Sequence, residues 1–234
     1  MTAMSVDTRL PVAVWGRLSP GQPVHLYLEG DGHAWRSSGR PSFDPTPHDP
    51  VALKLAAADT HASVLYLGRP CQYQVDIARG CHFSIWTERR FAEIDDMEAA
   101  LRQRIAADTD IILIGFSGGA NIAVQLAARL PNVKGMVTVA GNLDTNSFTR
   151  FHRLANEAYG HNAAILPTLS GLPQLYYTGV NDAVIPPELT RLQLKEVIEH
   201  IDCVQIEEVK SADHHGPWRI DWSAFAEVQR RCGI

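Results

Sequence analysis

The stretch Ile111-Ile112-Leu113-Ile114-Gly115-Phe116-Ser117-Gly118-Gly119 decides the fold, because an apolar run leads directly into a Gly-x-Ser-x-Gly motif. A run rich in β-branched residues, apolar on both faces, is typical of a strand inside a parallel sheet. Ile122, Leu126 and Leu130 then recur at helical spacing. The sequence therefore predicts a buried strand, a sharp turn at Ser117 and a helix, which is the order of a nucleophile elbow.

This turn would prepare Ser117 for nucleophilic chemistry. A serine attacks a carbonyl only if its Oγ stands clear of the backbone, and a strained strand-to-helix turn lifts it clear. Gly115 and Gly119 lack the side chains that would block close approach of the neighbouring backbone. The helix start also places N–H groups beside the serine, where they can stabilise negative charge.

Composition narrows the class of protein. The 234 residues suit one domain with a large core, and we expect a single domain over 1–234. The net charge of −5 gives no basic surface that would favour nucleic acid. No apolar run reaches membrane-spanning length, so we expect no membrane span. The chain has no Cys-x-x-Cys pair, which argues against a structural zinc site, and we expect no metal and no cofactor.

Two of the four cysteines, Cys71 and Cys81, lie in one loop-like stretch and are close enough in sequence to bridge. A disulfide there would stabilise the loop by about 2–4 kcal/mol in an oxidising compartment. Two free thiols in a cytoplasmic protein are the alternative. A Cys71–Cys81 bond would favour a periplasmic or secreted protein, so the sequence leaves the compartment open.

Short apolar runs alternate with helical patterns along the chain, which is typical of an α/β sheet. The predicted strands are Val12–Trp15, Val24–Leu28, Ser63–Leu67, Asp110–Gly115, Gly135–Ala140, Gln174–Thr178 and Val204–Val209. The predicted helices are Asp49–Ala58, Ile94–Ile105, the helix after Ser117, Leu194–Ile201 and a C-terminal helix that begins near Trp222.

A serine nucleophile needs a base and a carboxylate that orients the base. The acid candidate is Asp182, because it follows the apolar strand Gln174–Thr178 through a glycine-containing loop and precedes a helix opened by Pro186 and Pro187. This places its carboxylate at the same edge of the sheet as the serine. Asp144, after the preceding strand, is a second and weaker candidate.

The base candidate lies in Asp213-His214-His215, after the last strand and before the last helix. A loop in that place can bring an imidazole over the elbow. We favour His214, with His215 as the alternative. A metal cluster of these three residues is a rival interpretation, but no further ligand stands at a recognisable spacing.

An oxyanion hole is the third requirement of acyl transfer. Glu29-Gly30-Asp31-Gly32 follows a predicted strand and resembles the His-Gly-Gly-Gly loop of lipases and esterases. By that match the donors would be the N–H groups of Asp31, Gly32 and Gly118. Because a carboxylate repels an oxyanion, the Asp31 side chain must point away, toward Arg36, Arg40 or solvent.

Together the elbow, the acid loop and the histidine loop, in this order, resemble the α/β-hydrolase superfamily. The stretches Tyr27–Gly32, Arg69–Tyr73, Trp86–Thr87 and Asn142–Asp144 are similar to a group of small bacterial serine-hydrolase-type proteins of undefined substrate. The resemblance implies a mostly parallel, doubly wound sheet with a short cap, 142–168, between strands 6 and 7 of the family's numbering.

The resemblance also implies an activity, that of a carboxylesterase-like serine hydrolase acting on a small-molecule ester through an acyl-enzyme. Ser117, Asp182 and His214 would form the triad, and no cofactor would be needed. Thioesterase, amidase or peptidase activity, or a non-catalytic binding protein on the same scaffold, are the alternatives. The candidate mouth carries aromatic groups that suit an apolar substrate, namely Trp35, Phe116, Phe148 and Trp218.

Overall fold

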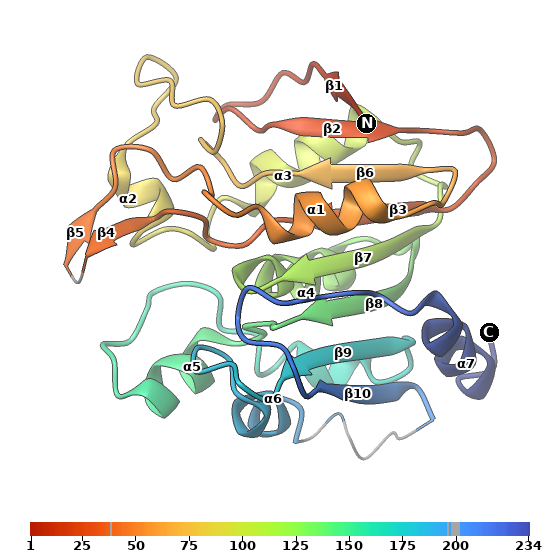
Figure 1. Ribbon diagram of the computed structural model, residues 1–234. Coiled ribbons are helices and arrows are strands. Elements are labelled where there is room, and N and C mark those ends of the chain that lie inside the picture. Colours follow the sequence, from red (N-terminus) through yellow and green to blue (C-terminus); the bar gives the residue numbers. More distant parts are fainter. Residues whose placement is uncertain (38, 196, 198–201) are drawn as a thin grey trace.

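The computed structural model describes residues 1–37, 39–195, 197 and 202–234, and within them one mixed sheet runs through the molecule (Figure 1). Its first two pairings are antiparallel and the rest are parallel. The strands in spatial order are β1 (Thr2–Met4), β2 (Val14–Arg17), β6 (Val64–Leu67), β3 (Val24–Leu28), β7 (Ile111–Phe116), β8 (Val133–Val139), β9 (Gln174–Gly179) and β10 (Val204–Val209).

Helices cover both faces of this sheet, and a small hairpin stands apart from it (Figure 1). The helices are α1 (Val51–Ala58), α2 (Phe83–Trp86), α3 (Ile94–Arg102), α4 (Gly118–Arg129), α5 (Thr145–His152), the 3₁₀ turn η1 (Leu166–Leu169), α6 (Pro187–Gln193) and α7 (Trp222–Arg231). The hairpin pairs β4 (Trp35–Ser37) with β5 (Arg40–Pro41).

Alternate residues of each central strand enter separate cores on the two faces of the sheet. Leu26, Leu28 and Leu113 pack in the core that contains the buried residues of α3 and α4. Tyr27 and Ile114 pack in the other core, with α1 and with Phe225 of α7. Because both faces are covered, the strands read as continuous apolar runs. The predicted α/β class with a mostly parallel, doubly wound sheet is confirmed.

The predicted strands all occur, with ends shifted by a few residues at most. The predicted helix at Leu194–Ile201 is wrong where the chain is described there, because α6 ends at Gln193 and turns follow at Leu194, Lys195 and Val197. The remainder of that prediction, including Ile198 and Ile201, lies outside the described residues.

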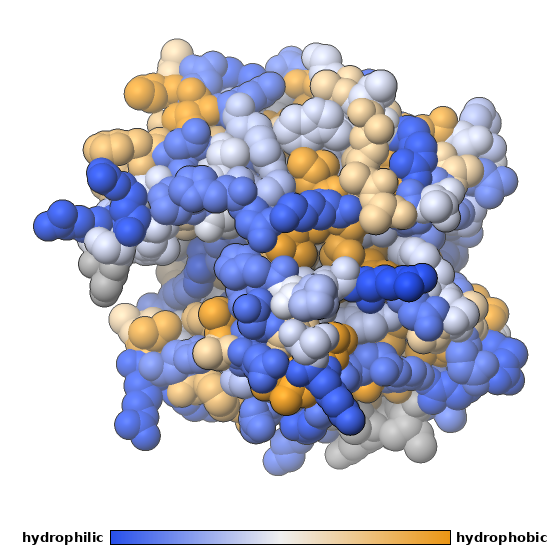
Figure 2. Space-filling view, in the orientation of Figure 1, coloured by the Kyte–Doolittle hydropathy of each residue, from blue (hydrophilic) through white to orange (hydrophobic). Residues whose placement is uncertain are grey.

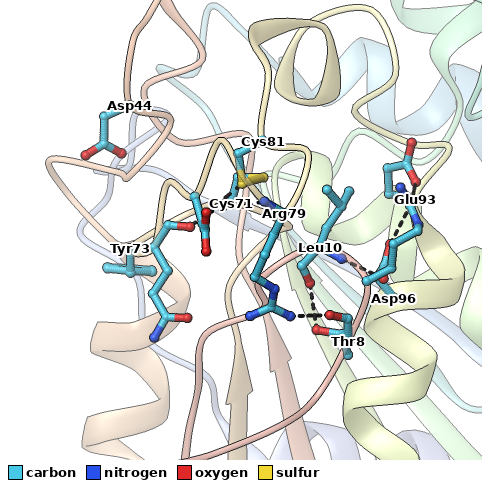
Figure 3. Close-up of a disulfide and its surroundings, with 12 residues drawn as sticks. Thr8, Leu10, Asp44, Cys71, Tyr73, Arg79, Cys81, Glu93 and Asp96 are labelled. Atoms are coloured by element: carbon cyan, nitrogen blue, oxygen red, sulfur yellow. Dashed lines mark hydrogen bonds and ion pairs between the residues drawn. A yellow bond between two sulfur atoms is a disulfide. The ribbon is translucent and has the colours of Figure 1, made fainter.

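The four cysteines pair at disulfide distance, as Cys71–Cys81 and Cys203–Cys232. The first pair lies beside a loop in which Arg79 donates to the Thr8 carbonyl (Figure 3). The second pair, which the sequence did not predict, joins the start of β10 to the residue that caps α7. In the described part of the chain, no helix is both long and apolar enough to span a bilayer.

Candidate active site

Ser117 occupies a strained turn between β7 and α4. Its φ of +50° and ψ of −120° lie outside the regions that non-glycine residues favour. A Cβ on Gly115 would stand 2.5 Å from the Ala120 backbone, and a Cβ on Gly119 would stand 2.2 Å from the Leu28 carbonyl oxygen. The two motif glycines are therefore required by close backbone approach, as the sequence predicts.

Loops from two other strands bring an acid and a base to this turn. His214 Nε2 lies 3.0 Å from Ser117 Oγ, and His214 Nδ1 lies 2.9 Å from Asp182 Oδ2. Asp182 follows β9 and His214 follows β10, so both reach the site from the carboxyl ends of parallel strands. The geometry allows the imidazole to accept the serine proton while Asp182 fixes its orientation.

The Asp182 carboxylate is held in its charged form. Burial raises the pKa of this group, but the hydrogen bond from His214 and the N–H groups of Ile185 and Val184 outweigh burial, and the net pKa is lowered. Those two N–H groups donate to Oδ1 at 2.8 and 2.7 Å, which leaves Oδ2 for the imidazole. The acid is therefore anchored independently of the base.

The structure separates the two adjacent histidines. His215 is exposed at the cavity mouth, and its backbone N–H donates to the Asp213 carboxylate. Trp218 Nε1 donates to the His214 carbonyl at 3.2 Å and so helps to hold the loop that carries His214. Among the residues described, no three histidine, cysteine or carboxylate side chains converge as metal ligands.

The loop after β3 lies beside the serine. Within the described chain, the N–H groups of Asp31, Gly32 and Gly118 have no hydrogen-bond acceptor. The Asp31 carboxylate lies against Gly118, where a Cβ would stand 2.3 Å from its Oδ1. A side chain at Gly118 would therefore collide with this carboxylate.

Two arginines neutralise the Asp31 carboxylate. Arg69 Nη1 lies 3.2 Å from Oδ1, and Arg90 pairs with Oδ2 and with Glu157. These partners differ from the expected Arg36 and Arg40. The carboxylate also lies beside Gly118, whereas we expected it to point away from the proposed oxyanion donors. Arg69 and Arg90 were missed because they lie far from Asp31 in sequence and no local pattern links them.

Glu29 takes a structural part in the same loop. Its buried carboxylate accepts hydrogen bonds from Gly30 N and Tyr66 OH and lies within 3.4 Å of two N–H groups at the start of α1. Burial raises the pKa of Glu29, and these donors offset the rise only in part. Because Pro50 offers α1 no side-chain cap, Glu29 serves that end of the helix and fixes the loop to it.

A cavity of about 530 Å³ opens above Ser117. Trp35, Phe116 and Phe148 line it, as expected, together with His33 and His48, which stack at 4.2 Å between ring centroids. Trp218 is not among the described lining residues. Its ring packs instead near Gly179, and its indole N–H donates to the histidine loop. Contact between Trp218 and substrate stays a prediction that this position does not support.

The segment 142–168 contributes to the cavity wall. Asn142 and Phe148 line the cavity, and α5 begins at Thr145. Asp144, the weaker acid candidate, caps α5 and accepts hydrogen bonds from Ser147, Asn162 and Ala163. The described donors to its carboxylate lie within the segment, and Gln193 Nε2 donates to its carbonyl oxygen from α6. The described carboxylate partner of His214 is Asp182.

No family model matches the sequence, and comparison with curated proteins finds no match. Solved structures match over nearly the whole chain. One is an α/β serine hydrolase without a lid from Xanthomonas campestris (16% identity, TM-score 0.57, 98% of this chain and 92% of that one). Another is an esterase domain from Rhodothermus marinus (12%, 0.59, 99% and 94%) and a third is Est1E from Butyrivibrio proteoclasticus (12%, 0.62, 97% and 96%). With its sheet order and helix placement, the chain has the α/β-hydrolase fold.

Proposed function

We propose that the protein is a serine hydrolase that acts on a carboxylic ester through an acyl-enzyme. One observation supports this above the others, namely the continuous line of hydrogen-bond distances from Ser117 Oγ through His214 to Asp182. A serine that only forms part of a glycine-rich turn is not expected to lie at hydrogen-bond distance from an imidazole that a buried carboxylate orients.

Each residue has a defined role in the proposed reaction. His214 removes the proton of Ser117 as Oγ attacks the carbonyl carbon, and returns it to the leaving alcohol. Asp182 stabilises the imidazolium that forms in between. The N–H groups of Asp31, Gly32 and Gly118 bind the oxyanion. A water that the same histidine activates then releases the acid.

The cavity walls suit an ester with an apolar portion. Trp35, Phe116 and Phe148 offer aromatic surface close to the serine, and the volume of about 530 Å³ is that of a small-molecule site. We propose that the segment 142–168 is a short cap at one side of the opening within a single domain. An open mouth of this kind admits substrate without a large lid movement.

A serine-reactive phosphonate with peptide mapping tests the proposal. We expect one labelled residue, Ser117, and no labelling of the Ser117→Ala variant. Turnover of p-nitrophenyl esters of increasing chain length, compared with a matched thioester and anilide, then identifies the bond that is cleaved. Labelling elsewhere, or esterase turnover retained by Ser117→Ala, would reject the assignment.

A further inference from the structure

Two separate segments form the rim of the cavity mouth. Trp35 of the β4–β5 hairpin and Phe148 of α5 line the same cavity, so the hairpin and the helix both border it. In Figure 1 both lie on the side of the molecule toward which the parallel strands point. Anything that docks across this opening must contact both.

Each segment exposes apolar side chains at its tip. Phe43, just beyond β5, is 82% exposed, and Leu154, just beyond α5, is 56% exposed. Trp35 and Phe151 are exposed beside them. Figure 2 shows hydrophobic groups interspersed with strongly hydrophilic ones along this edge. Exposed apolar side chains that border one opening gain free energy if they insert together into an apolar phase.

Four exposed arginines belong to the same two segments, and exposed Asp44 follows Phe43. Arg36 and Arg40 belong to the hairpin, and Arg150 and Arg153 belong to α5 and its cap; all four are exposed. Across the described chain, none of the four comes within ion-pair distance of a carboxylate, whereas many of the other cations do so. The guanidinium of Arg36 lies 5.6 Å from the centroid of the Phe43 ring.

This charge is opposite to that of the molecule as a whole, whose net charge is −5. A cluster of arginines without acidic partners favours an anionic partner. Phe43 and Leu154 offer no hydrogen bond, so they suit hydrocarbon better than a sugar ring or a polar polymer. Arginines that hold phosphate groups while neighbouring apolar side chains enter the acyl region are the pattern of a protein that lies on an anionic bilayer.

We propose that Arg36, Arg40, Phe43, Arg150, Arg153 and Leu154, here called the arginine rim, are a docking surface for an anionic lipid bilayer. Docking seats the mouth of the Ser117 cavity against the lipid headgroups. That the esters reaching Ser117 come from the bilayer rests in addition on the proposed function.

Vesicle sedimentation tests the arginine rim without relying on turnover. The full-length Ser117→Ala protein is mixed with vesicles of phosphatidylcholine alone or of phosphatidylcholine with phosphatidylglycerol. We expect binding to the anionic vesicles, weakened by added salt. The double variant Arg150→Gln/Arg153→Gln should bind about 25-fold more weakly, because each arginine near the surface contributes about fivefold. Phe43→Ser/Leu154→Ser should lose about tenfold.

The matched control is Arg102→Gln/Arg230→Gln, which removes the same charge from α3 and α7. We expect its vesicle binding to equal that of the parent. Equal binding to both kinds of vesicle, or equal loss in the control, would overturn the proposal. Tighter binding to soluble polygalacturonate than to anionic vesicles would also overturn it and would assign the surface to an acidic polymer.

Different results would reject the proposed hydrolase function and the proposed docking surface. A protein that binds anionic vesicles but is not labelled by the phosphonate has the docking surface without the hydrolase function. A protein that hydrolyses soluble esters but ignores vesicles has the function without the docking surface.

Discussion

The two ends of the parallel sheet each hold a histidine bound to an aspartate, yet only one of the two pairs meets a nucleophile. At the carboxyl edge, His214 Nδ1 lies 2.9 Å from Asp182, and at the amino edge, His25 Nδ1 lies 2.7 Å from Asp59. In both pairs the aspartate is nearly inaccessible to solvent.

The surroundings of the second imidazole nitrogen distinguish the pairs. His214 Nε2 faces a serine hydroxyl, whereas the ring of His25 is stacked between His61 and Trp222, with centroids 4.0 Å away on either side. No described hydroxyl donates to or accepts from the His25 ring, although a cavity of about 970 Å³ lies beside it. A histidine and an aspartate at hydrogen-bond distance are therefore no evidence of catalysis by themselves.

The largest expected difference between the ends is in turnover. His214→Ala should lower kcat on a p-nitrophenyl ester by about 10⁵–10⁶-fold, because the serine loses its base. His25→Ala should leave kcat close to the wild-type value, since its ring is remote from Ser117. Steady-state kinetics on both variants checks this. Comparable losses in the two would show that our separation of the pairs is wrong.

The aspartates should differ in the same way. Asp182→Asn should lower kcat by about 10⁴-fold, since the imidazole loses the group that orients and stabilises it. Asp59→Asn should instead lower the free energy of unfolding by about 1–3 kcal/mol, because His25, Tyr27 and the backbone of His61 lose a charged acceptor. Denaturant unfolding measured beside the kinetics separates the outcomes, and a folded Asp182→Asn protein with full activity would contradict the proposed triad.

The two ends of the sheet also differ in the length of the loop that the cysteine pair at each end closes. Replacing Cys203 and Cys232, 29 residues apart, by serine should cost about 4 kcal/mol of stability, and replacing Cys71 and Cys81, 10 apart, about 3 kcal/mol. The longer loop loses more entropy on closure in the unfolded chain. Thermal unfolding of the two double variants gives the order, and intact mass with and without reductant establishes whether each bond forms. A reversed order would indicate that contacts of the closed loops outweigh their length.

The smallest expected effect concerns pH. Burial lowers the pKa of His25 below its usual 6.5, although the bond to Asp59 raises it in part. The unfolded chain therefore binds more protons as pH falls below about 6.5, so this histidine's contribution to stability is constant above that pH and is lost below it.

One group changes stability by at most about 1.4 kcal/mol per pH unit. We expect the difference in unfolding free energy between wild type and His25→Gln to move in favour of the variant as the pH falls from 7 to 5. Urea unfolding at several pH values measures the difference and cancels the titration of other groups. A difference that is constant over this range would show that the pKa of His25 is not lowered.

Much of the fold could be predicted because the central strands are buried on both faces. Mostly apolar or β-branched runs form the strands Ile111–Phe116 and Gln174–Gly179. Such runs can be recognised as buried strands from the sequence alone. The hairpin of β4 and β5 was missed because its strands are very short and mostly exposed, so they show no alternation of apolar and polar residues. The end of α6 was missed because apolar spacing continues beyond Gln193 after the helix stops.

The chemistry-bearing residues of the site could be predicted from the order of motifs, but their mutual arrangement could not. The sequence favours His214 but leaves His215 as an alternative, and the turn that pairs Asp213 with Gly216 directs His214 toward Ser117. The pairing of Cys203 with Cys232 depends on how α7 packs against the sheet, and no sequence spacing encodes that.

The Cys203–Cys232 pair has a topological consequence for the proposed base. With this bond formed, β10, the histidine loop and α7 lie on one covalent ring, because Cys203 precedes β10 and Cys232 follows α7. A protease that cuts once inside the ring leaves both pieces attached to each other. Nicked protein would then migrate as a full-length band until reductant is added, and His214 would stay tethered to the sheet on either side of the cut.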